Sequence, residues 1–232
     1  MLVTATICFG LLAIAGGAGY YIYTLLHVDP IVVASDASET DRIAAVAGWL
    51  DDQFEKYRFN GGVLIIRDGR VLLSKACGYT DNSTTHRIDK HTAFQLASVS
   101  KQFTAAGVLR LVEMGLLDLD DSVAEHLENF PLENVSVRHL LNQTSGIPDE
   151  YMSLAEEHRE TAGDILTISR AVKLVMRHSK SDRAPGDAME YSNTNYVLLA
   201  GVIEAVSGKI FERFMTEDGC QPLGMKDTRV WN

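Results

Sequence analysis

A serine and a lysine stand three residues apart in the stretch 94–106, which reads FQLASVSKQFTAA. They are Ser98 and Lys101, at the start of a long apolar run. Residues three apart on a helix project from the same face, so the Lys101 amine can reach the Ser98 hydroxyl. A serine hydroxyl is a poor nucleophile until a base takes its proton, and a lysine beside apolar residues can supply that base. The spacing therefore indicates a nucleophilic serine with its own activating lysine, and the alternative is an ordinary helix entrance.

The predicted position of Ser98 in the first turn of a helix adds to this chemistry. The first turn carries backbone N–H groups without intrahelical partners and the positive end of the helix dipole. Both favour the negative charge that develops on a carbonyl oxygen when a hydroxyl attacks it. The same turn could therefore provide a nucleophile and help to stabilise the resulting oxyanion.

A second pair, Tyr191 and Asn193, forms the only Tyr-x-Asn in the chain. Residues two apart in an extended loop point the same way, so the two side chains could approach Ser98 and Lys101 together. The phenol could then relay protons, and the amide could orient the lysine or the substrate. The alternative is a tyrosine packed at a helix entrance, with Asn193 as the N-cap.

The N-terminal part of the soluble chain is predicted to be a helix followed by a hairpin. A helix capped by Asp41 is expected to end before Asn60, because its apolar residues recur at helical spacing. The β-branched runs 62–66 and 71–74 flank an Asp-Gly, which is a strong hairpin signal. The sequence offers no good strand candidate after residue 75, although a hairpin usually needs further strands beside it.

The rest of the chain is predicted to be helical. The run 98–114 has almost no polar face beyond its first turn, which predicts a helix in the middle of a domain. The acidic stretch 151–160 predicts a solvated surface. Shorter helices are expected after the cap at 120–122 and over residues 136–141, 165–178, 197–206 and 210–215. Together with the hairpin, these elements predict the α+β class.

Composition excludes some functions. The net charge of −10 argues against a nucleic-acid partner, which would require a basic surface. The three cysteines, Cys8, Cys77 and Cys220, have no metal-ligand spacing, and free thiols are favoured over a Cys77–Cys220 disulfide. His86 and His91 lie in a polar stretch without a ligand pattern, so we expect solvated loop histidines and neither a metal nor a cofactor.

The first 28 residues contain no Asp, Glu, Lys or Arg. Residues 2–26 are long enough to cross a hydrocarbon core of about 30 Å at about 1.5 Å per residue. We expect a transmembrane anchor at 1–28, a linker at 29–40 and one domain at 41–232. The alternative is a cleaved signal peptide, because small residues near Ala15 resemble a processing site. The first basic residue is Arg42, so the Lys and Arg bias that normally sets the orientation of a membrane segment is absent. An extracytoplasmic domain, anchored in the periplasm or at the cell surface or secreted after cleavage, is therefore expected only from the family resemblance described next.

Five segments, in order and with similar spacing, resemble the serine β-lactamase-like family of class C β-lactamases, D-alanyl-D-alanine carboxypeptidases and related esterases. The segments are residues 97–105, 111–122, 139–149, 185–196 and 222–228. The resemblance covers about residues 42–229. It implies the β-lactamase/transpeptidase-like fold for the domain.

The resemblance also implies roles for the four polar residues. Ser98 would be the acylated nucleophile, and Lys101 its proton acceptor or electrostatic partner. Tyr191 would act as acid and base, and Asn193 would position the reacting groups. Gln143 departs from the pattern, since relatives often have histidine there, but that loop is usually structural and we expect little effect.

A larger departure concerns the third motif of the family, Lys-Thr-Gly or His-x-Gly on a late strand. In relatives this strand supplies one oxyanion N–H and belongs to three C-terminal strands that pair with the hairpin. No Lys-x-Gly or His-x-Gly occurs in the 232 residues, so the domain is expected to be incomplete at its C-terminus. Because losing one oxyanion donor costs about 100- to 1,000-fold in rate, we expect residues 1–232 alone to be weakly active or inactive.

The sequence thus predicts a membrane-anchored serine hydrolase that forms an acyl-enzyme on Ser98. Its substrates would be peptidoglycan-type peptides, esters or β-lactams, with peptidase or esterase activity favoured over a dedicated β-lactamase. The alternative is a catalytically inactive, membrane-tethered binding or scaffolding module that retains part of the fold. Retention of the four polar residues argues against that module, and the absence of the third motif argues for it.

Overall fold

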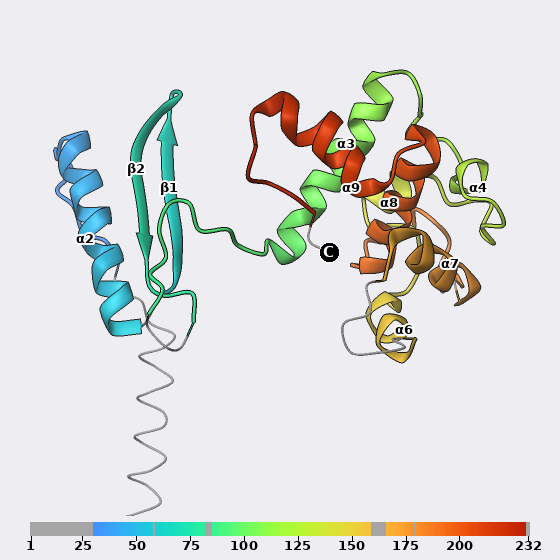
Figure 1. The fold of residues 1–232 in the computed structure, drawn as a ribbon, viewed down its shortest axis with the longest axis horizontal. Coiled ribbons are helices and arrows are strands. Elements are labelled where there is room, and N and C mark those ends of the chain that lie inside the picture. The colour runs from blue at the N-terminus through green and yellow to red at the C-terminus, as the bar shows by residue number, and fades with distance from the viewer. Residues whose placement is uncertain (1–29, 58, 82–84, 159–165, 179, 231–232) are drawn as a thin grey trace, which may run out of the picture. The chain divides into compact units, whose positions relative to one another are not determined.

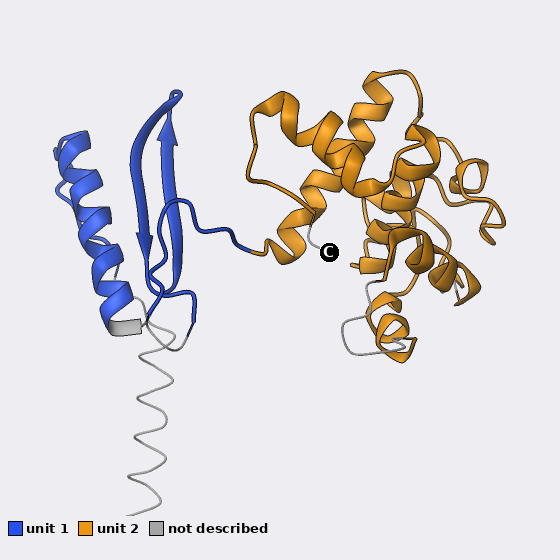
Figure 2. Cartoon of the chain, in the orientation of Figure 1, with its two compact units in different colours: residues 1–94 blue, residues 95–232 orange. Residues whose placement is uncertain are grey.

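The computed structural model describes residues 30–57, 59–81, 85–158, 166–178 and 180–230 (Figure 1). These residues form two compact units that divide between Phe94 and Gln95 (Figure 2). The predicted membrane segment at 1–28 lies outside the described residues. Within the described ranges, no helix is both long enough and apolar enough to span a bilayer.

The first unit contains helix α2 (Glu39–Tyr57) and an antiparallel hairpin of β1 (Gly61–Arg67) and β2 (Arg70–Cys77). Asp68 and Gly69 form the turn with φ values of 51° and 74°, the positive values that a two-residue hairpin turn requires. The predicted hairpin is therefore confirmed. In the part of the chain that the structure describes, its sheet has two strands.

Helix α2 begins at Glu39, three residues earlier than predicted. The cap is Ser38, whose hydroxyl accepts a hydrogen bond from the Asp41 N–H at 3.1 Å. The Asp41 carboxylate in turn accepts from the Ser38 hydroxyl at 2.6 Å and from the Ser38 N–H at 3.3 Å. This is a reciprocal capping box, in which Asp41 occupies the third helical position. The prediction of Asp41 as the cap was wrong because a serine three residues upstream competes for the same role.

The second unit is helical. A 3₁₀ turn (Ala97–Ser100) directly precedes α3 (Lys101–Glu113). The last two elements of the unit are a π turn (Met215–Cys220) and a 3₁₀ turn (Gln221–Leu223). The helices between them are α4 (Val123–His126), α5 (Val137–Leu141), α6 (Tyr151–Glu157), α7 (Ile168–His178), α8 (Asn193–Ser207) and α9 (Phe211–Phe214). Capping boxes begin α4 and α5, with Ser122 and Ser136 as the N-caps. The predicted cap at 120–122 is confirmed at Ser122, whereas Ser136, predicted as the first helical residue, is the N-cap of α5. The acidic stretch predicted as surface contains α6, with His158 exposed after its end.

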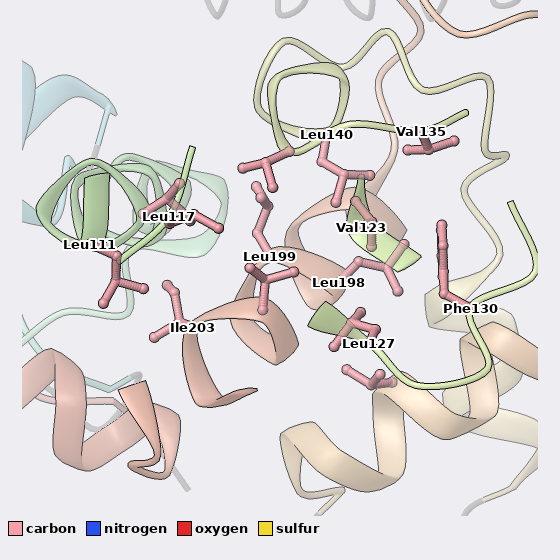
Figure 3. Packing of buried hydrophobic residues seen from close by; sticks show 14 of the residues in the cluster. Leu111, Leu117, Val123, Leu127, Phe130, Val135, Leu140, Leu198, Leu199 and Ile203 are labelled. Carbon is pink, nitrogen blue, oxygen red and sulfur yellow. The ribbon is translucent and has the colours of Figure 1, made fainter. Parts of the chain in front are cut away.

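Helix α8 lies at the centre of this unit and contacts α3, α4, α5, α6, α7 and α9. Its Leu198, Leu199 and Val202 are fully buried, and they pack with residues from the surrounding helices in one apolar cluster (Figure 3). Burying each such side chain contributes about 1.5–3 kcal/mol, so α8 is firmly held. The prediction that the 98–114 helix occupies this central place was wrong, because α3 buries one stripe while Leu109 remains half exposed.

The thiols of the described cysteines are free. Cys220 is buried and Cys77 is half-buried. The prediction of free thiols over a Cys77–Cys220 disulfide is confirmed for these two residues, and Cys8 lies outside the described residues.

Candidate active site

Ser98 lies in the 3₁₀ turn that precedes α3, rather than inside one continuous helix. The preceding residue, Ala97, has a φ of 45°, in the left-handed region that residues with a Cβ rarely adopt. The Ser100 hydroxyl closes the turn by donating to the Ala97 carbonyl at 2.6 Å. The Ser98 side chain is exposed, so its hydroxyl is accessible to a second molecule. Backbone strain of this kind is typical of residues that a fold holds in place for function.

Lys101 is the first residue of α3, one turn beyond Ser98. Its Nζ lies 3.3 Å from the Ser98 Oγ and 2.6 Å from the Asn193 Oδ1. The aromatic rings of Tyr191 and Tyr196 lie 4.9 Å and 5.7 Å from the same nitrogen. These contacts hold the amine at the serine, since a cation is attracted to the face of an aromatic ring.

Tyr191 makes the shortest contact to the serine. Its hydroxyl oxygen lies 2.7 Å from the Ser98 Oγ, and 3.3 Å from the Asn193 Oδ1. The nearby Lys101 and the hydrogen bond with Ser98 lower the pKa of the Tyr191 phenol, because both stabilise the phenolate. A phenol with a lowered pKa at this distance can exchange a proton with the serine hydroxyl.

Asn193 is held with a defined amide orientation. Its Oδ1 accepts from Lys101, while its Nδ2 donates to the Asp149 carboxylate at 2.9 Å. The other oxygen of Asp149 accepts from the Asn193 backbone N–H at 2.8 Å. The single carboxylate therefore contacts both the backbone and the side chain of this residue.

The loop 143–149 positions Tyr191 and Asn193 by capping α8. Helix α8 begins at Asn193, four residues earlier than predicted, with Ser192 as its N-cap. Ser192 makes no side-chain cap to its own helix; its hydroxyl donates to the Pro148 carbonyl at 3.2 Å. The Ser192 N–H instead donates to the Gln143 Oε1 at 3.0 Å. The prediction of an extended loop at Tyr191–Asn193 was wrong at Asn193, which is already helical, yet both side chains reach Ser98 and Lys101.

Gln143 lies at the centre of a network of buried polar groups at the start of α8. The residue is 7% exposed and has a φ of 60°. Its side-chain oxygen also accepts from the Asn195 Nδ2 at 2.7 Å, and the Asn195 Oδ1 accepts from the Ser145 hydroxyl at 2.6 Å. Its backbone carbonyl accepts from the Glu190 N–H at 2.8 Å. The network fixes the segment on which Tyr191 and Asn193 lie, so Gln143 contributes more to this region than the sequence suggested.

The structure thus brings together Ser98, Lys101, Tyr191 and Asn193, the four residues that the sequence singled out. Sequence reasoning missed Asp149 and the buried role of Gln143. Asp149 was visible only as the end of a segment that resembled the family, and nothing local connects it with a helix that starts 44 positions later. The predicted proximity of Ser98 and Lys101, by contrast, follows from helical spacing alone.

Other parts of the described chain offer less chemistry. No group of three or more potential metal ligands occurs among the described residues, and His86 and His91 are exposed. A groove of about 630 Å³ lies between α4, α7 and α8, with His126, Lys173 and Gly201 in its lining. None of the four site residues lines this groove, and it contains no comparable pairing of a hydroxyl with an amine and a phenol.

The arrangement is suited to covalent catalysis at a carbonyl. It provides an exposed hydroxyl, a phenol in hydrogen-bonding contact and an amine that contacts both the hydroxyl and an amide. Such a set can remove the proton of a nucleophile and return it to a leaving group. None of these steps requires a metal or a cofactor.

Known proteins share the sequence pattern and the fold. Residues 46–232 match the family described as Beta-lactamase. The chain is 37% identical over 182 residues to Penicillin-binding protein 4* of Bacillus subtilis (strain 168). The aligned residues cover 77% of this chain and 39% of that protein. The chain therefore spans about two fifths of the length of this curated relative.

Two solved structures illustrate the structural similarity. The penicillin binding protein from Bacillus halodurans has a TM-score of 0.69 at 27% identity, with 78% of this chain and 57% of that chain covered. The D-amino acid amidase from Ochrobactrum anthropi SV3, complexed with D-phenylalanine, has a TM-score of 0.67 at 30% identity, with 83% and 53% covered. The β-lactamase/transpeptidase-like fold predicted from the sequence is therefore confirmed.

Proposed function

The chain belongs to the Beta-lactamase family, and from this premise we propose that it is a serine hydrolase that forms an acyl-enzyme on Ser98. The single observation that carries the proposal is the contact of the Ser98 hydroxyl with both Tyr191, at 2.7 Å, and Lys101, at 3.3 Å. At an ordinary helix entrance the serine hydroxyl is expected to bond backbone N–H groups, not a phenol and an amine together.

Tyr191 is the group that takes the proton in this proposal. As the Ser98 oxygen attacks the substrate carbonyl, an oxygen–carbon bond forms and the hydroxyl proton passes to the Tyr191 phenolate. Lys101 stabilises that phenolate, consistent with the lowered pKa of Tyr191. When the carbon–nitrogen or carbon–oxygen bond of the substrate breaks, Tyr191 returns the proton to the departing amine or alcohol. Water then attacks the acyl carbon and gives a proton to Tyr191, and the bond to Ser98 breaks as Tyr191 returns that proton to the Ser98 oxygen.

Amides and esters of small molecules or peptides are the proposed substrates, with a dedicated β-lactamase activity less favoured. The relatives support this choice through their names, a penicillin-binding protein and a D-amino acid amidase. A penicillin would serve as a covalent probe of the same hydroxyl, since its ring carbonyl needs the same nucleophile. The site residues alone do not distinguish these carbonyl compounds, because selection depends on the shape of the surrounding pocket.

We further propose that the protein is anchored by residues 1–28 with its domain outside the cytoplasm. The support is the uncharged, apolar N-terminal sequence. For residues 1–232 alone we expect little or no turnover, because the Lys-x-Gly or His-x-Gly motif that relatives use for one oxyanion donor does not occur in them.

The test is labelling of the protein, at the full length that its gene encodes, with a fluorescent penicillin and with a fluorescent fluorophosphonate. We expect labelling by at least one probe, its loss in Ser98→Ala, and its retention in Ser169→Ala, which removes an exposed hydroxyl on α7. Unchanged labelling of Ser98→Ala would remove Ser98 from the mechanism. Absence of labelling in the unaltered protein would favour the non-catalytic, membrane-tethered binding module instead.

A further inference from the structure

We infer that Asp149 is a positioning residue for the reaction, which sets the direction of the Asn193 amide and thereby the place of the Lys101 amine. The inference rests on the proposed function, since it assigns a part in the same site to a residue that does not touch the serine. It starts from the two hydrogen bonds between the Asp149 carboxylate and Asn193, at 2.8 Å to the backbone N–H and 2.9 Å to Nδ2.

Asp149 is exposed, but its backbone is fixed on both sides. The neighbouring Pro148 carbonyl accepts from the Ser192 hydroxyl at 3.2 Å. On the other side, the Tyr151 N–H donates to the Thr194 hydroxyl at 3.1 Å. The chain around Asp149 is therefore bonded to the start of α8 before and after the carboxylate. Two hydrogen bonds accepted by a carboxylate that is held in this way specify direction as well as distance.

The direction matters because an amide has two unlike ends. An asparagine side chain presents an acceptor oxygen on one side and a donor NH₂ on the other. In the structure the oxygen faces Lys101 at 2.6 Å and the NH₂ faces Asp149. Turning the amide over would set the NH₂ against the lysine amine and the oxygen against the carboxylate. Both new contacts would be repulsive, so Asp149 and Lys101 together allow one orientation.

The Lys101 amine depends on this orientation for its place. The Asn193 oxygen is its shortest contact, and from there the amine reaches the Ser98 oxygen at 3.3 Å. A reversed amide would thus displace the amine that stabilises the Tyr191 phenolate in the proposed reaction. Asp149 does not touch the serine, and it acts through Asn193.

Two substitutions that remove the same charge separate this role from others. In Asp149→Ala the Asn193 amide loses its partner but stays free to keep its oxygen on Lys101. In Asp149→Asn the new side chain can satisfy the Asn193 backbone N–H only by placing its own NH₂ against the Asn193 NH₂. The easiest relief is a reversed Asn193 amide, which sets donor against donor at Lys101. The orientation role therefore predicts that asparagine is worse than alanine at this position.

The experiment compares these variants in the protein at the full length that its gene encodes, with an activated ester and a fluorophosphonate as probes. We expect kcat to fall roughly 3- to 10-fold in Asp149→Ala and roughly 100-fold in Asp149→Asn, with KM changing less than about 2-fold, since misplaced catalytic groups reduce the rate of the bound complex. Asp149→Glu and Asp149→Gln repeat the comparison one methylene longer, with the amide again expected to be the worse of the two. Glu150→Gln is the charge-matched control and should leave kcat within about 2-fold, because Glu150 has no contact with Asn193 among the contacts of the described residues.

A different ranking of the kcat values of the Asp149 variants would overturn the inference. A helix-capping role predicts that asparagine nearly replaces aspartate while alanine is the worse variant, because asparagine and aspartate cap helices about equally well. A role of charge alone predicts equal effects of alanine and asparagine. Either pattern, in variants with native circular dichroism, excludes an orienting role for Asp149. Failure of the proposed function is distinguishable, because the unaltered protein would then not be acylated at Ser98 at all.

Discussion

The hydroxyl oxygens of Ser98 and Tyr191 lie 2.7 Å apart, although 93 positions separate them in the sequence. The serine is fixed by the turn before α3, and the tyrosine by the capped start of α8. Helices α3 and α8 pack against each other in the second unit, which explains how two local features meet. In the proposed mechanism the phenol, rather than the amine at 3.3 Å, is the first acceptor of the serine proton.

Replacement of Tyr191 by phenylalanine tests this assignment. Loss of the hydroxyl should lower kcat for an activated ester by about 100- to 1,000-fold, because a positioned acid or base typically contributes about 10²- to 10⁴-fold. Tyr151→Phe is the control, since the Tyr151 side chain is not among the groups that contact Ser98. A Tyr191→Phe variant with nearly full activity would show that Lys101 takes the proton alone.

The pH dependence of acylation tests the electrostatic role of Lys101. Tyr191 acts as a base only as the phenolate, so the rate should rise with pH through its pKa. Lys101 and Ser98 lower this pKa, and removal of the lysine should move it back towards the usual value of about 10. We therefore expect Lys101→Met to lower the rate near neutral pH and to shift the rising limb of the pH–rate profile to higher pH.

Stopped-flow acylation measured between acid and alkaline pH gives this profile for both proteins. Loss of the rising limb in Lys101→Met would identify Lys101 itself as the titrating base. A shift of the limb to lower pH would contradict the stabilisation of the phenolate by the lysine.

The polar network around Gln143 should contribute measurably to the stability of the fold. Gln143→Ala removes the acceptor for the Ser192 N–H and the Asn195 amide, both fully buried. Leaving a buried donor unsatisfied costs about 1–3 kcal/mol, so two donors should lower the free energy of unfolding by about 2–6 kcal/mol. Chemical denaturation measures the change, with Gln221→Ala as an exposed control. A loss no larger than that of the control would show that the network carries little free energy.

The strained turn at Ala97 predicts an unusual response to glycine. Ala97→Gly should raise the free energy of unfolding by about 1 kcal/mol, because glycine adopts a positive φ without the steric cost that alanine carries. Ala106→Gly, inside α3, should instead lower the free energy of unfolding by about 0.5–1 kcal/mol. Thermal melts of the two variants should thus move in opposite directions. A lower melting temperature in both variants would mean that the left-handed conformation at residue 97 costs little free energy.

Local signals explain which parts of the fold could be predicted. The hairpin follows from the Asp-Gly turn between two β-branched runs, and the start of α4 follows from the cap at Ser122. In these cases the residues that define an element are neighbours in the sequence. The same locality explains why Ser98 and Lys101 could be paired from their spacing.

The start of α8 shows what local signals omit. Ser192 occupies the N-cap position without a side-chain cap bond. The N–H groups of Ser192 and Asn193 donate instead to Gln143 and Asp149, which lie 49 and 44 positions upstream. The central position of α8, rather than α3, likewise depends on which helices pack around it. Asp149 could not be singled out because a carboxylate gains its role here only from a partner that folding brings to it.

The most direct test of the central claim is the mass of the protein after reaction with a penicillin, followed by fragmentation of the peptide that contains Ser98. The protein, at the full length that its gene encodes, should gain the mass of one acyl group, and the fragments should place that group on Ser98. An adduct on another residue, or an adduct that persists in Ser98→Ala, would contradict the assignment of Ser98 as the nucleophile.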